Sequence, residues 1–419
     1  MLRGTTFVVA LFVSATGLAQ SLEDRVRAHG FILSFDEYEQ HSILAKDDSY
    51  RYYVAIDGKL SFTTVELYDY MSGNGDREVA DEALVSVEYL MADIWAVTSR
   101  PRYYLGGDWS RYAELRFPHG DTMSRVARLH RMLAVMAAED GRHEDLLKSL
   151  RAMQTVSGHA ADQPGLIGVL VARSVEDRMH ATIVTAANYF ADDAQGLAML
   201  TEFVGSLPER PLMTGLKRQL PLTLNLIEQL VNGELPLSYL LTSFERLDAL
   251  GLDTLFRLSD NEDPLRERYL RIMLDFAEVW GDHAAVVNVE DEMDAELEED
   301  TEDMAVMLSN MVMLALLPMY SGGHAGELTS VARARITKIG LAAMQIRRTS
   351  GEWPTLEAAA QTAGVDPADP FGDRIHYLPS KNSLTMYSNG RDMEDHGGKR
   401  REGPDSPYDW PIVTFRSAG

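Results

Sequence analysis

A chain of 419 residues with a formal net charge of −25 is long enough for two or three domains, and its charge argues against nucleic acid or anionic lipid as a partner. With 45% hydrophobic and 25% charged residues it can bury ordinary cores, so we expect a globular protein. The absence of cysteine excludes a disulfide framework, a thiol nucleophile and a lipid-modified cysteine.

Residues 1–19 have the composition of a secretory signal peptide. Arg3 supplies a positive charge, a short apolar run follows, and Gly17 and Ala19 are small residues at the positions a signal peptidase requires. The apolar run is too short to span a bilayer comfortably. We therefore expect a periplasmic or secreted protein of a Gram-negative-type bacterium, with a mature chain that begins at Gln20 and has no transmembrane helix.

Residues 20–120 give mixed signals and predict an N-terminal region that is mixed or helical. Within 52–62, Asp57-Gly58 supplies the positive φ that a two-residue hairpin turn needs. The same residues also fit one irregular helix, and both alternatives stay open. Residues 79–97 predict a helix, because their apolar side chains recur at three- to four-residue spacing.

The clearest pattern covers 121–187 and predicts three consecutive antiparallel helices, each with one apolar face. Asp121 can cap the first helix, Glu139-Asp-Gly141 breaks it, and the second ends near Gly158 before a third begins after Pro164. Further helices are expected over 195–206, 221–232, 237–250 and 265–280. We therefore predict an α-helical hairpin domain over 121–320, which resembles the helical domains of uncharacterised exported bacterial proteins.

Three stretches then differ sharply in composition. Residues 290–303 are rich in carboxylates, which is typical of a solvated helix face or a linker. Residues 304–319 are strongly apolar but short and interrupted by polar residues and a proline, so they predict a buried core helix rather than a membrane span. Residues 321–326 contain three glycines and predict a flexible joint.

The end of the chain carries several short motifs in order. Residues 366–372 read Asp-Pro-Ala-Asp-Pro-Phe-Gly, and 384–398 contain Tyr-Ser-Asn-Gly-Arg-Asp and end on a glycine pair. Before them, 332–346 have helical spacing and lead to Gly-Glu-Trp-Pro-Thr at 351–355. Over about 328–415 this order resembles the C-terminal part of the major pseudopilins of type II secretion.

The resemblance implies a small α+β module within 328–419. We expect a helix at 332–346 whose Ile336, Ile339, Ala343 and Ile346 face a three-stranded antiparallel sheet, with strands at 375–378, 384–387 and 411–415. The predicted fold class is therefore mainly α, a helical hairpin array followed by this module. Pseudopilins begin with a prepilin-peptidase site and a long apolar helix, which a signal peptide replaces here, so we interpret the module as a recruited unit.

In pseudopilins the loop before the last strand holds a calcium ion, so the resemblance implies possible Ca²⁺ binding here. By motif position it assigns a ligand role to Asp392, to the backbone near Ser388, and to a second aspartate at Asp395 or Asp405. The loop 388–410 does offer hard oxygens, which calcium prefers. Two departures are Lys399-Arg-Arg401, inserted after the glycine pair, and a second aspartate that is out of register. The alternative is a plain turn tied by aspartate and asparagine hydrogen bonds.

The sequence contains no motif typical of a known catalytic site, of a phosphate-binding loop or of a zinc site. The tightest grouping is His119, Asp121 and His130, with Glu139, His143 and Glu144 one helical hairpin away. Facing helices can assemble such groups into a metal site, although packed or surface histidines explain them equally simply. We expect an exported non-catalytic interaction or structural protein with a protein partner. The alternative is a secreted hydrolase or metalloenzyme with its site between the helices of 121–187.

Overall fold

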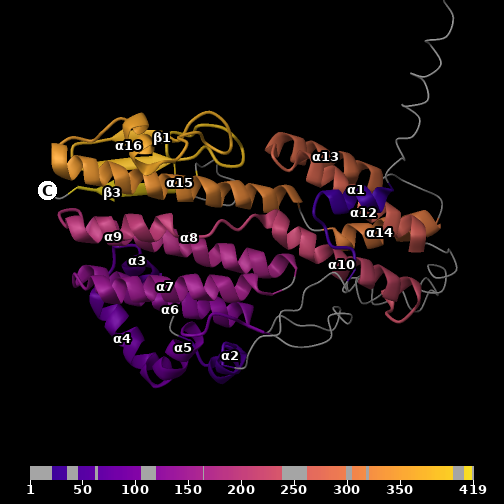
Figure 1. Cartoon of the computed structure of the whole chain (residues 1–419), viewed down its shortest axis with the longest axis horizontal. Coiled ribbons are helices and arrows are strands. Elements are labelled where there is room, and N and C mark those ends of the chain that lie inside the picture. Colours follow the sequence, from indigo (N-terminus) through magenta and orange to yellow (C-terminus); the bar gives the residue numbers. More distant parts are fainter. Residues whose placement is uncertain are drawn as a thin grey trace, which may run out of the picture. The chain divides into compact units, whose positions relative to one another are not determined.

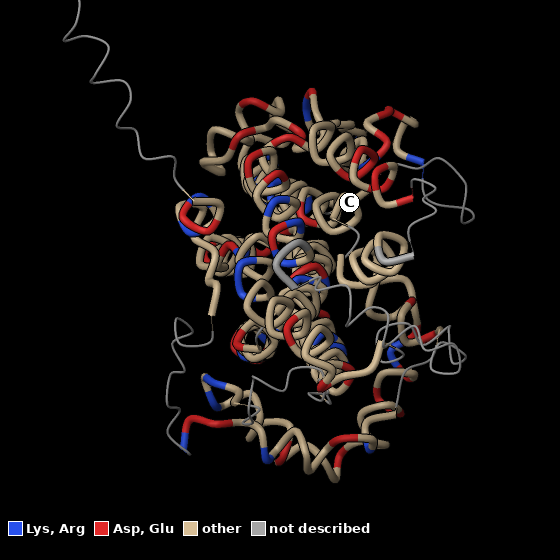
Figure 2. The backbone as a smooth tube through the Cα atoms, turned by 90° about the vertical axis from the view of Figure 1, so that its right-hand side faces the viewer, with Lys and Arg blue, Asp and Glu red and all other residues tan. Residues whose placement is uncertain are grey.

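The computed structural model describes residues 21–34, 46–61, 65–104, 119–163, 165–237, 262–298, 304–317, 320–399 and 410–417. These residues form a mainly helical protein with a small three-stranded antiparallel sheet near the C-terminus, which confirms the predicted fold class (Figure 1). Acidic residues are distributed over many of the described helices (Figure 2), in keeping with the net charge of −25. The predicted signal peptide, Asp405 and nearly all of the helix expected at 237–250 lie outside the described residues.

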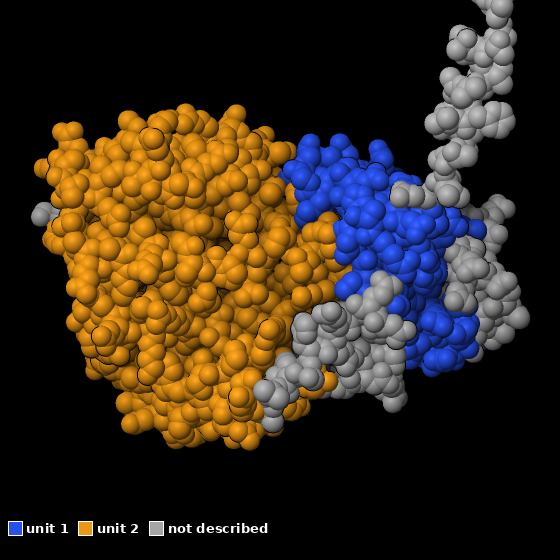
Figure 3. Space-filling model, in the orientation of Figure 1, with its two compact units in different colours: residues 1–38, 220–318 blue, residues 39–219, 319–419 orange. Residues whose placement is uncertain are grey.

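The chain divides into two compact units, and both are assembled from separate parts of the sequence (Figure 3). Unit 1 takes residues up to 38 and 220–318, and unit 2 takes 39–219 and 319–419. The boundary expected from the sequence near 320 lies beside the division at 318–319, whereas the one expected near 120 falls inside unit 2. As limits of independently folding domains, both stay predictions.

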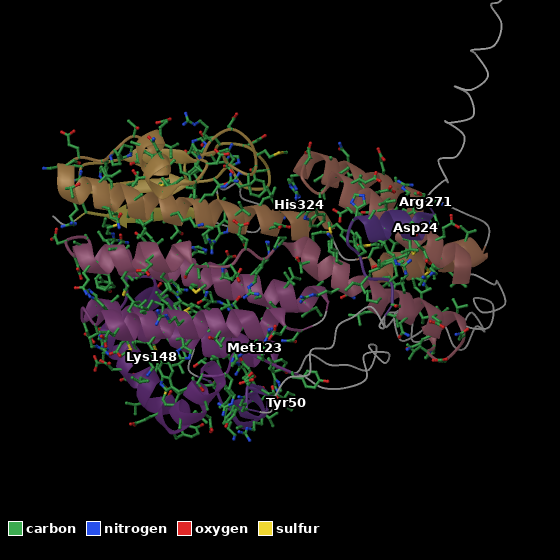
Figure 4. The ribbon with its side chains drawn as sticks, in the orientation of Figure 1. Asp24, Tyr50, Met123, Lys148, Arg271 and His324 are labelled. Carbon is green, nitrogen blue, oxygen red and sulfur yellow. The ribbon has the colours of Figure 1, made fainter. Side chains whose placement is uncertain are left out.

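Unit 1 is a group of helices fastened by ion pairs between distant segments. Its described elements are α1 (Leu22–Ala28), the second half of α10 (Leu212–Val231), α12 (Glu262–Val279), α13 (His283–Leu297) and α14 (Met304–Leu316). Arg25 on α1 pairs with Glu278 at 3.0 Å, and Arg266 on α12 pairs with Glu23 at 2.9 Å. Figure 4 marks Asp24 on α1 and Arg271 on α12. The exposed carboxylates of 291–298 lie along α13, so the solvated helix face is confirmed for this part of the acidic run.

The apolar run predicted as a core helix is α14, and it is buried on one side only. Leu308 and Val312 are fully buried, whereas Val306 and Leu314 are 44% and 41% exposed. Its buried Asn310 is satisfied, since its amide donates to the Leu297 carbonyl at the end of α13 and its oxygen accepts from Arg268. By length and composition alone, the stretch Val306–Ser350 is apolar enough to cross a membrane, and 31% of its most apolar window is buried.

The core of unit 2 is the helical stack predicted over 121–187. The helices are α6 (Gly120–Glu139), α7 (His143–Ala161) and α8 (Leu166–Tyr189), and α9 (Ala194–Gly205) follows them. Each of the three packs against the other two. Most side chains of their apolar faces are buried, with Val126, Leu129, Leu150, Val175 and Met179 fully so, whereas Leu170, which the same pattern turned inward, is 43% exposed. The three antiparallel helices are therefore confirmed.

The N-terminal part of unit 2 is helical. Its elements are α2 (Tyr50–Ile56), α3 (Val65–Met71), α4 (Arg77–Val87), η2 (Glu88–Leu90) and α5 (Met91–Thr98). The hairpin alternative at 52–62 is wrong, because Tyr53 and Ile56 are three residues apart and both fully buried on one face of α2. Gly58, with a φ of +68°, ends this helix instead of turning a hairpin.

The C-terminal part of unit 2 is the expected α+β module. It contains α15 (Tyr320–Ser350), α16 (Leu356–Ala363), β1 (His376–Pro379), β2 (Ser383–Tyr387) and β3 (Ile412–Arg416). The strands are antiparallel in the order β1-β2-β3, with Tyr387 of β2 paired to His376 on one side and Ile412 on the other. The predicted strands are confirmed to within a residue at each end.

The flexible joint predicted at 321–326 is wrong, because α15 begins at Tyr320 and runs through these glycines. Tyr320 and His324 are each only 2% exposed, so the first turns of α15 are held by packing. A Cβ at Gly323 would lie 2.9 Å from the Leu212 side chain, which shows that glycine here permits a close approach of helices. Of the residues expected to face the sheet, Ile336, Ile339 and Ala343 are fully buried and Ile346 partly.

Gly340 and Gly326 on α15 provide a matched test of this packing. A Cβ at Gly340 would lie 1.9 Å from the ring of Phe415 on β3, whereas one at the exposed Gly326 meets nothing within 4 Å. Because Phe415 is fully buried, we expect Gly340→Ala to destabilise the fold by about 1–3 kcal/mol. Gly326→Ala should stabilise it by about 0.5–1 kcal/mol through helix propensity. Urea unfolding of both variants measures this, and equal effects would refute the placement of β3 on α15.

Candidate functional site

The loop after β2 is fastened at its base by Asp369, a buried carboxylate that the sequence analysis did not single out. Its Oδ1 accepts hydrogen bonds from Ser388 Oγ at 2.8 Å and from the Phe371 amide at 3.1 Å. Its Oδ2 accepts one from the Asn389 amide at 2.9 Å. Asp369 stands before a proline in the motif 366–372, a position at which aspartate side chains commonly bond the backbone two residues on, and this was the available signal.

The same base joins the two ends of the loop. The Ser388 amide donates to the Pro411 carbonyl at 3.3 Å, and the Trp410 amide donates to the Ser388 carbonyl at 3.1 Å. His376 stacks on Tyr387 with ring centroids 4.4 Å apart and contacts the Asn389 amide oxygen at 2.7 Å. The first residues of the loop are therefore held by the sheet, by Asp369 and by the start of β3.

The predicted calcium ligands make local hydrogen bonds. Ser388 Oγ is buried and also accepts from the Gly390 amide at 3.2 Å. Asp392 accepts from the Glu394 amide at 3.3 Å, and the His396 ring lies 3.1 Å from its other oxygen. Asp395 accepts from the Gly397 amide and the Tyr387 hydroxyl, and these bonds hold the pKa of its carboxyl below the usual range.

Within the part of the chain that the structure describes, no three acidic or histidine side chains converge as metal ligands. Asp405 lies outside the described residues, so the predicted set of Ser388, Asp392, Asp395 and Asp405 is placed only in part. The described residues hold the base of the loop through hydrogen bonds to Asp369 and between Ser388, Trp410 and Pro411.

The histidines of the alternative metal site have separate partners. His119 meets the Tyr103 hydroxyl at 2.7 Å, and His143 bonds Asp193 at the start of α9. His130 is fully buried beside Trp95, with ring centroids 4.8 Å apart, and burial together with Lys148 lowers its pKa to about 3. Figure 4 marks Lys148 on α7. These side chains belong to packing contacts in different places.

A cavity of about 300 Å³ lies inside unit 2 and has a distinctive lining. The turn after α3, the helices α6, α8 and α15, and the strand β3 with the two residues before it all contribute. Val184, Ile412 and Val413 supply apolar wall, and the basic side chains are those of Arg131, His180, Arg333 and Arg416. None of the described lining residues is an aspartate or a glutamate.

The arginines at this cavity have few anionic partners. Arg131 donates to the Met71 carbonyl at 3.0 Å, while its Nε is buried with no hydrogen-bond partner among the described residues. Burial, followed by the proximity of Arg178 and Arg333, lowers the pKa of Arg131 to about 10. Arg333 has one carboxylate nearby, Asp177 at 3.6 Å.

The rings of Trp410 and His180 also line the first cavity. The guanidinium of Arg333 lies 4.9 Å from the ring centroid of Trp410, which is 45% exposed. His180 is 7% exposed, and its Nδ1 has no partner within the described structure. Burial lowers the pKa of His180 to about 3, and Arg333 and Lys338 act in the same direction, so the ring is neutral near pH 7.

A second cavity of about 300 Å³ in unit 2 gives the contrast. Two of its three arginines are paired with carboxylates, Arg210 2.7 Å from Glu176 and Arg173 3.2 Å from Glu327, and the third, Arg335, donates to the Ala368 carbonyl. The fold therefore does compensate buried cations elsewhere, and the lining of the first cavity differs from it in kind. No sequence motif pointed to the first cavity, because its lining residues come from five segments that are distant in the chain.

Comparison with protein-family models, curated proteins and solved structures found no match. The resemblance to pseudopilins therefore stays a prediction that rests on the motifs themselves.

Asp369 and Asp366 of the same motif test the anchoring of the loop. Asp369→Ala leaves the donors of three buried hydrogen bonds without their acceptor and should cost about 1–3 kcal/mol of stability. Amide hydrogen exchange at Asn389 should become faster. Asp366→Ala removes an exposed carboxylate that accepts only from the Ala368 amide and should leave exchange at Asn389 unchanged. Unaltered exchange in Asp369→Ala would show that the loop is held by other means.

Proposed function

We propose that this chain is an exported, non-catalytic binding protein whose ligand site is the cavity between α8, α15 and β3. The observation that carries the proposal is the lining, apolar on one side and bearing several buried, poorly paired polar groups on the other. Ligand sites generally combine an apolar wall with a few convergent polar groups. Perturbed titratable groups in a cavity, here Arg131 and His180, also mark functional sites.

The titration of the lining supports binding rather than catalysis. A general base works best with a pKa near the working pH, and His180, at about 3, is far from it. The hydroxyls of Ser72, Thr185 and Thr414 line the cavity without an adjacent carboxylate among the described lining residues. No comparable observation favours the hydrolase or metalloenzyme alternative.

Export and a protein partner are parts of the same proposal. Export rests on residues 1–19, and N-terminal sequencing of the exported protein should begin at Gln20. The C-terminal module, with the antiparallel order that a pseudopilin-like unit implies, is the surface that we propose for a protein partner in the periplasm or outside the cell.

Val184 on α8 allows the cavity to be filled or enlarged at one position. The mature chain, screened against a library of small molecules by thermal shift, should bind some of them and melt at a higher temperature, since a ligand of the folded state stabilises it. Val184→Phe should remove this increment, and Val184→Ala, which leaves the cavity open, should retain it. If the ligand-induced shift in melting temperature were unchanged in both variants, the ligands would bind outside this cavity. Turnover of a substrate that only Val184→Phe abolishes would refute the non-catalytic part.

We also propose calcium as a ligand of the loop 388–410, on the strength of the pseudopilin resemblance and of its oxygen-rich composition. The carboxylates of Asp392 and Asp395 remain about half exposed, at 42% and 50% for the side chains, and are accessible to an ion. A complete ligand set requires further oxygens, for which Asp405 is the candidate.

Millimolar calcium should therefore raise the melting temperature of the full mature chain more than magnesium does. Asp392→Ala should abolish the calcium increment. Glu394→Ala, which removes another exposed carboxylate two residues away, should preserve it. Equal shifts with the two metals would leave Asp369 as the sufficient anchor of the loop.

A further inference from the structure

We propose that the cavity between α8, α15 and β3 recognises an anionic oxygen group, a carboxylate or a phosphate, carried on a small apolar body. This assignment rests on the proposed function of the cavity and names the class of ligand. The anionic group would lie against Arg131, Arg333 and His180, and the apolar body along Val184, Ile412 and Val413.

The first argument is the sign of the local charge. The chain has a net charge of −25, yet three arginines and no described carboxylate line this cavity. Arg333 lies close enough to Arg131 to disfavour the charge of Arg131 and lower its pKa. A bound anion would replace that repulsion with attraction and remove the cost of holding unpaired cations in a partly buried place.

The second argument is the set of donors that have no acceptor within the described structure. Nε of Arg131 is buried and unpaired, and Nδ1 of His180, which is a donor in one tautomer of the neutral ring, is likewise unpaired in a ring that is 7% exposed. Buried donors are nearly always satisfied in folded proteins, so unpaired ones need an explanation. A guanidinium presents its donors as a planar fork that fits the two oxygens of a carboxylate or phosphate.

The neighbouring cavity makes a purely structural explanation less economical. There, Arg173 and Arg210 are paired with Glu327 on α15 and Glu176 on α8, although Nη1 of Arg173 is also buried without a hydrogen-bond partner among the described residues. Beside the first cavity, Asp177 lies 3.6 Å from Arg333, and the Ser330 hydroxyl also donates to this carboxylate.

The third argument concerns the size and shape of the ligand. A volume of about 300 Å³ is at the lower end of ligand sites, which suits a small molecule. The apolar wall and the partly exposed ring of Trp410 beside Arg333 would cover a hydrocarbon or aromatic body. An inorganic ion alone would leave this wall unused.

Isosteric compounds test the class of ligand directly. Benzoate and benzamide have the same shape and differ in charge, phenyl phosphate carries the other anionic group, and inorganic phosphate lacks the apolar body. Calorimetric titration of the mature chain at about 0.15 M salt, where long-range repulsion is largely screened, should detect benzoate or phenyl phosphate binding. Benzamide should bind at least about tenfold more weakly, since charge-assisted hydrogen bonds are lost. Inorganic phosphate should also bind more weakly than phenyl phosphate.

Substitutions at arginines then assign the site. Arg131→Gln should weaken the anion by about tenfold or more while leaving any benzamide binding unchanged. Arg125→Gln, on the same helix but paired with Asp121 away from the cavity, is the matched control. Arg416→Gln provides an independent lining variant if Arg131→Gln does not fold, because Arg416 is exposed and its guanidinium donates a long hydrogen bond, 3.4 Å, to the Asn74 side chain.

The outcomes distinguish failure of the anionic ligand class from failure of the cavity as a ligand site. Benzamide binding as tightly as benzoate, with both lost in Val184→Phe, would refute the anionic class and leave the cavity as a ligand site. Anion binding that is unchanged in both Arg131→Gln and Arg416→Gln would refute the assignment to these arginines. If none of the four compounds binds, the anionic class fails, and the wider screen on Val184 decides the proposed function separately.

Discussion

The close contact between Gly340 of α15 and Phe415 of β3 is the constraint on which the C-terminal part of unit 2 depends. Only a glycine lets the ring lie where a Cβ would otherwise be, so the sheet packs directly on the backbone of α15. The same helix also packs on α8 and α9 of the helical stack. One helix therefore serves two layers, and β3 is brought beside α8, where Asn188 bonds the backbone of both Thr414 and Arg416. The cavity exists because these contacts fix its walls.

The electrostatics of unit 2 follow from the same arrangement. Helices α6, α8 and α15 each bring arginines to their shared boundary, and most of these find a carboxylate or a carbonyl. Where α15 meets β3, the strand supplies apolar side chains and no described carboxylate, and Arg131 and Arg333 both line the cavity. An acidic protein thus contains a local basic site that its overall composition conceals, because net charge describes the surface field and not an individual cavity.

Helical periodicity predicted the stack α6–α8 and the helix α15. Each of these helices buries an apolar face, and the apolar residues of that face recur at three- to four-residue spacing in the sequence. The predictions that failed were those based on local turn and glycine signals, which packing overrode. Asp57-Gly58 suits a hairpin turn, but Tyr53 and Ile56 are both fully buried on one face of α2. The glycines of 321–326 suit a joint, but Gly323 lies within α15 and permits a close contact with Leu212. Asp369 anchors the loop through Ser388, which is distant in the sequence. The lining of the cavity likewise combines three helices and a strand from separate parts of the chain. Spacing along the chain carries no information about such pairs.

The loop singled out from the sequence and the cavity found in the structure are physically connected through Ser388. Its side chain is held by Asp369, and its backbone exchanges hydrogen bonds with Trp410 and Pro411, which are themselves part of the cavity wall. Because the Asp369 carboxylate fixes Ser388, it also fixes the start of β3 and the position of Trp410 beside Arg333. Any ligand that orders the loop would act on the same pair of backbone bonds, so binding at the loop and binding in the cavity would share a mechanical link even though their ligands differ in sign of charge. The motif 366–372 is thus tied to the proposed function by the position it gives to the wall of the site.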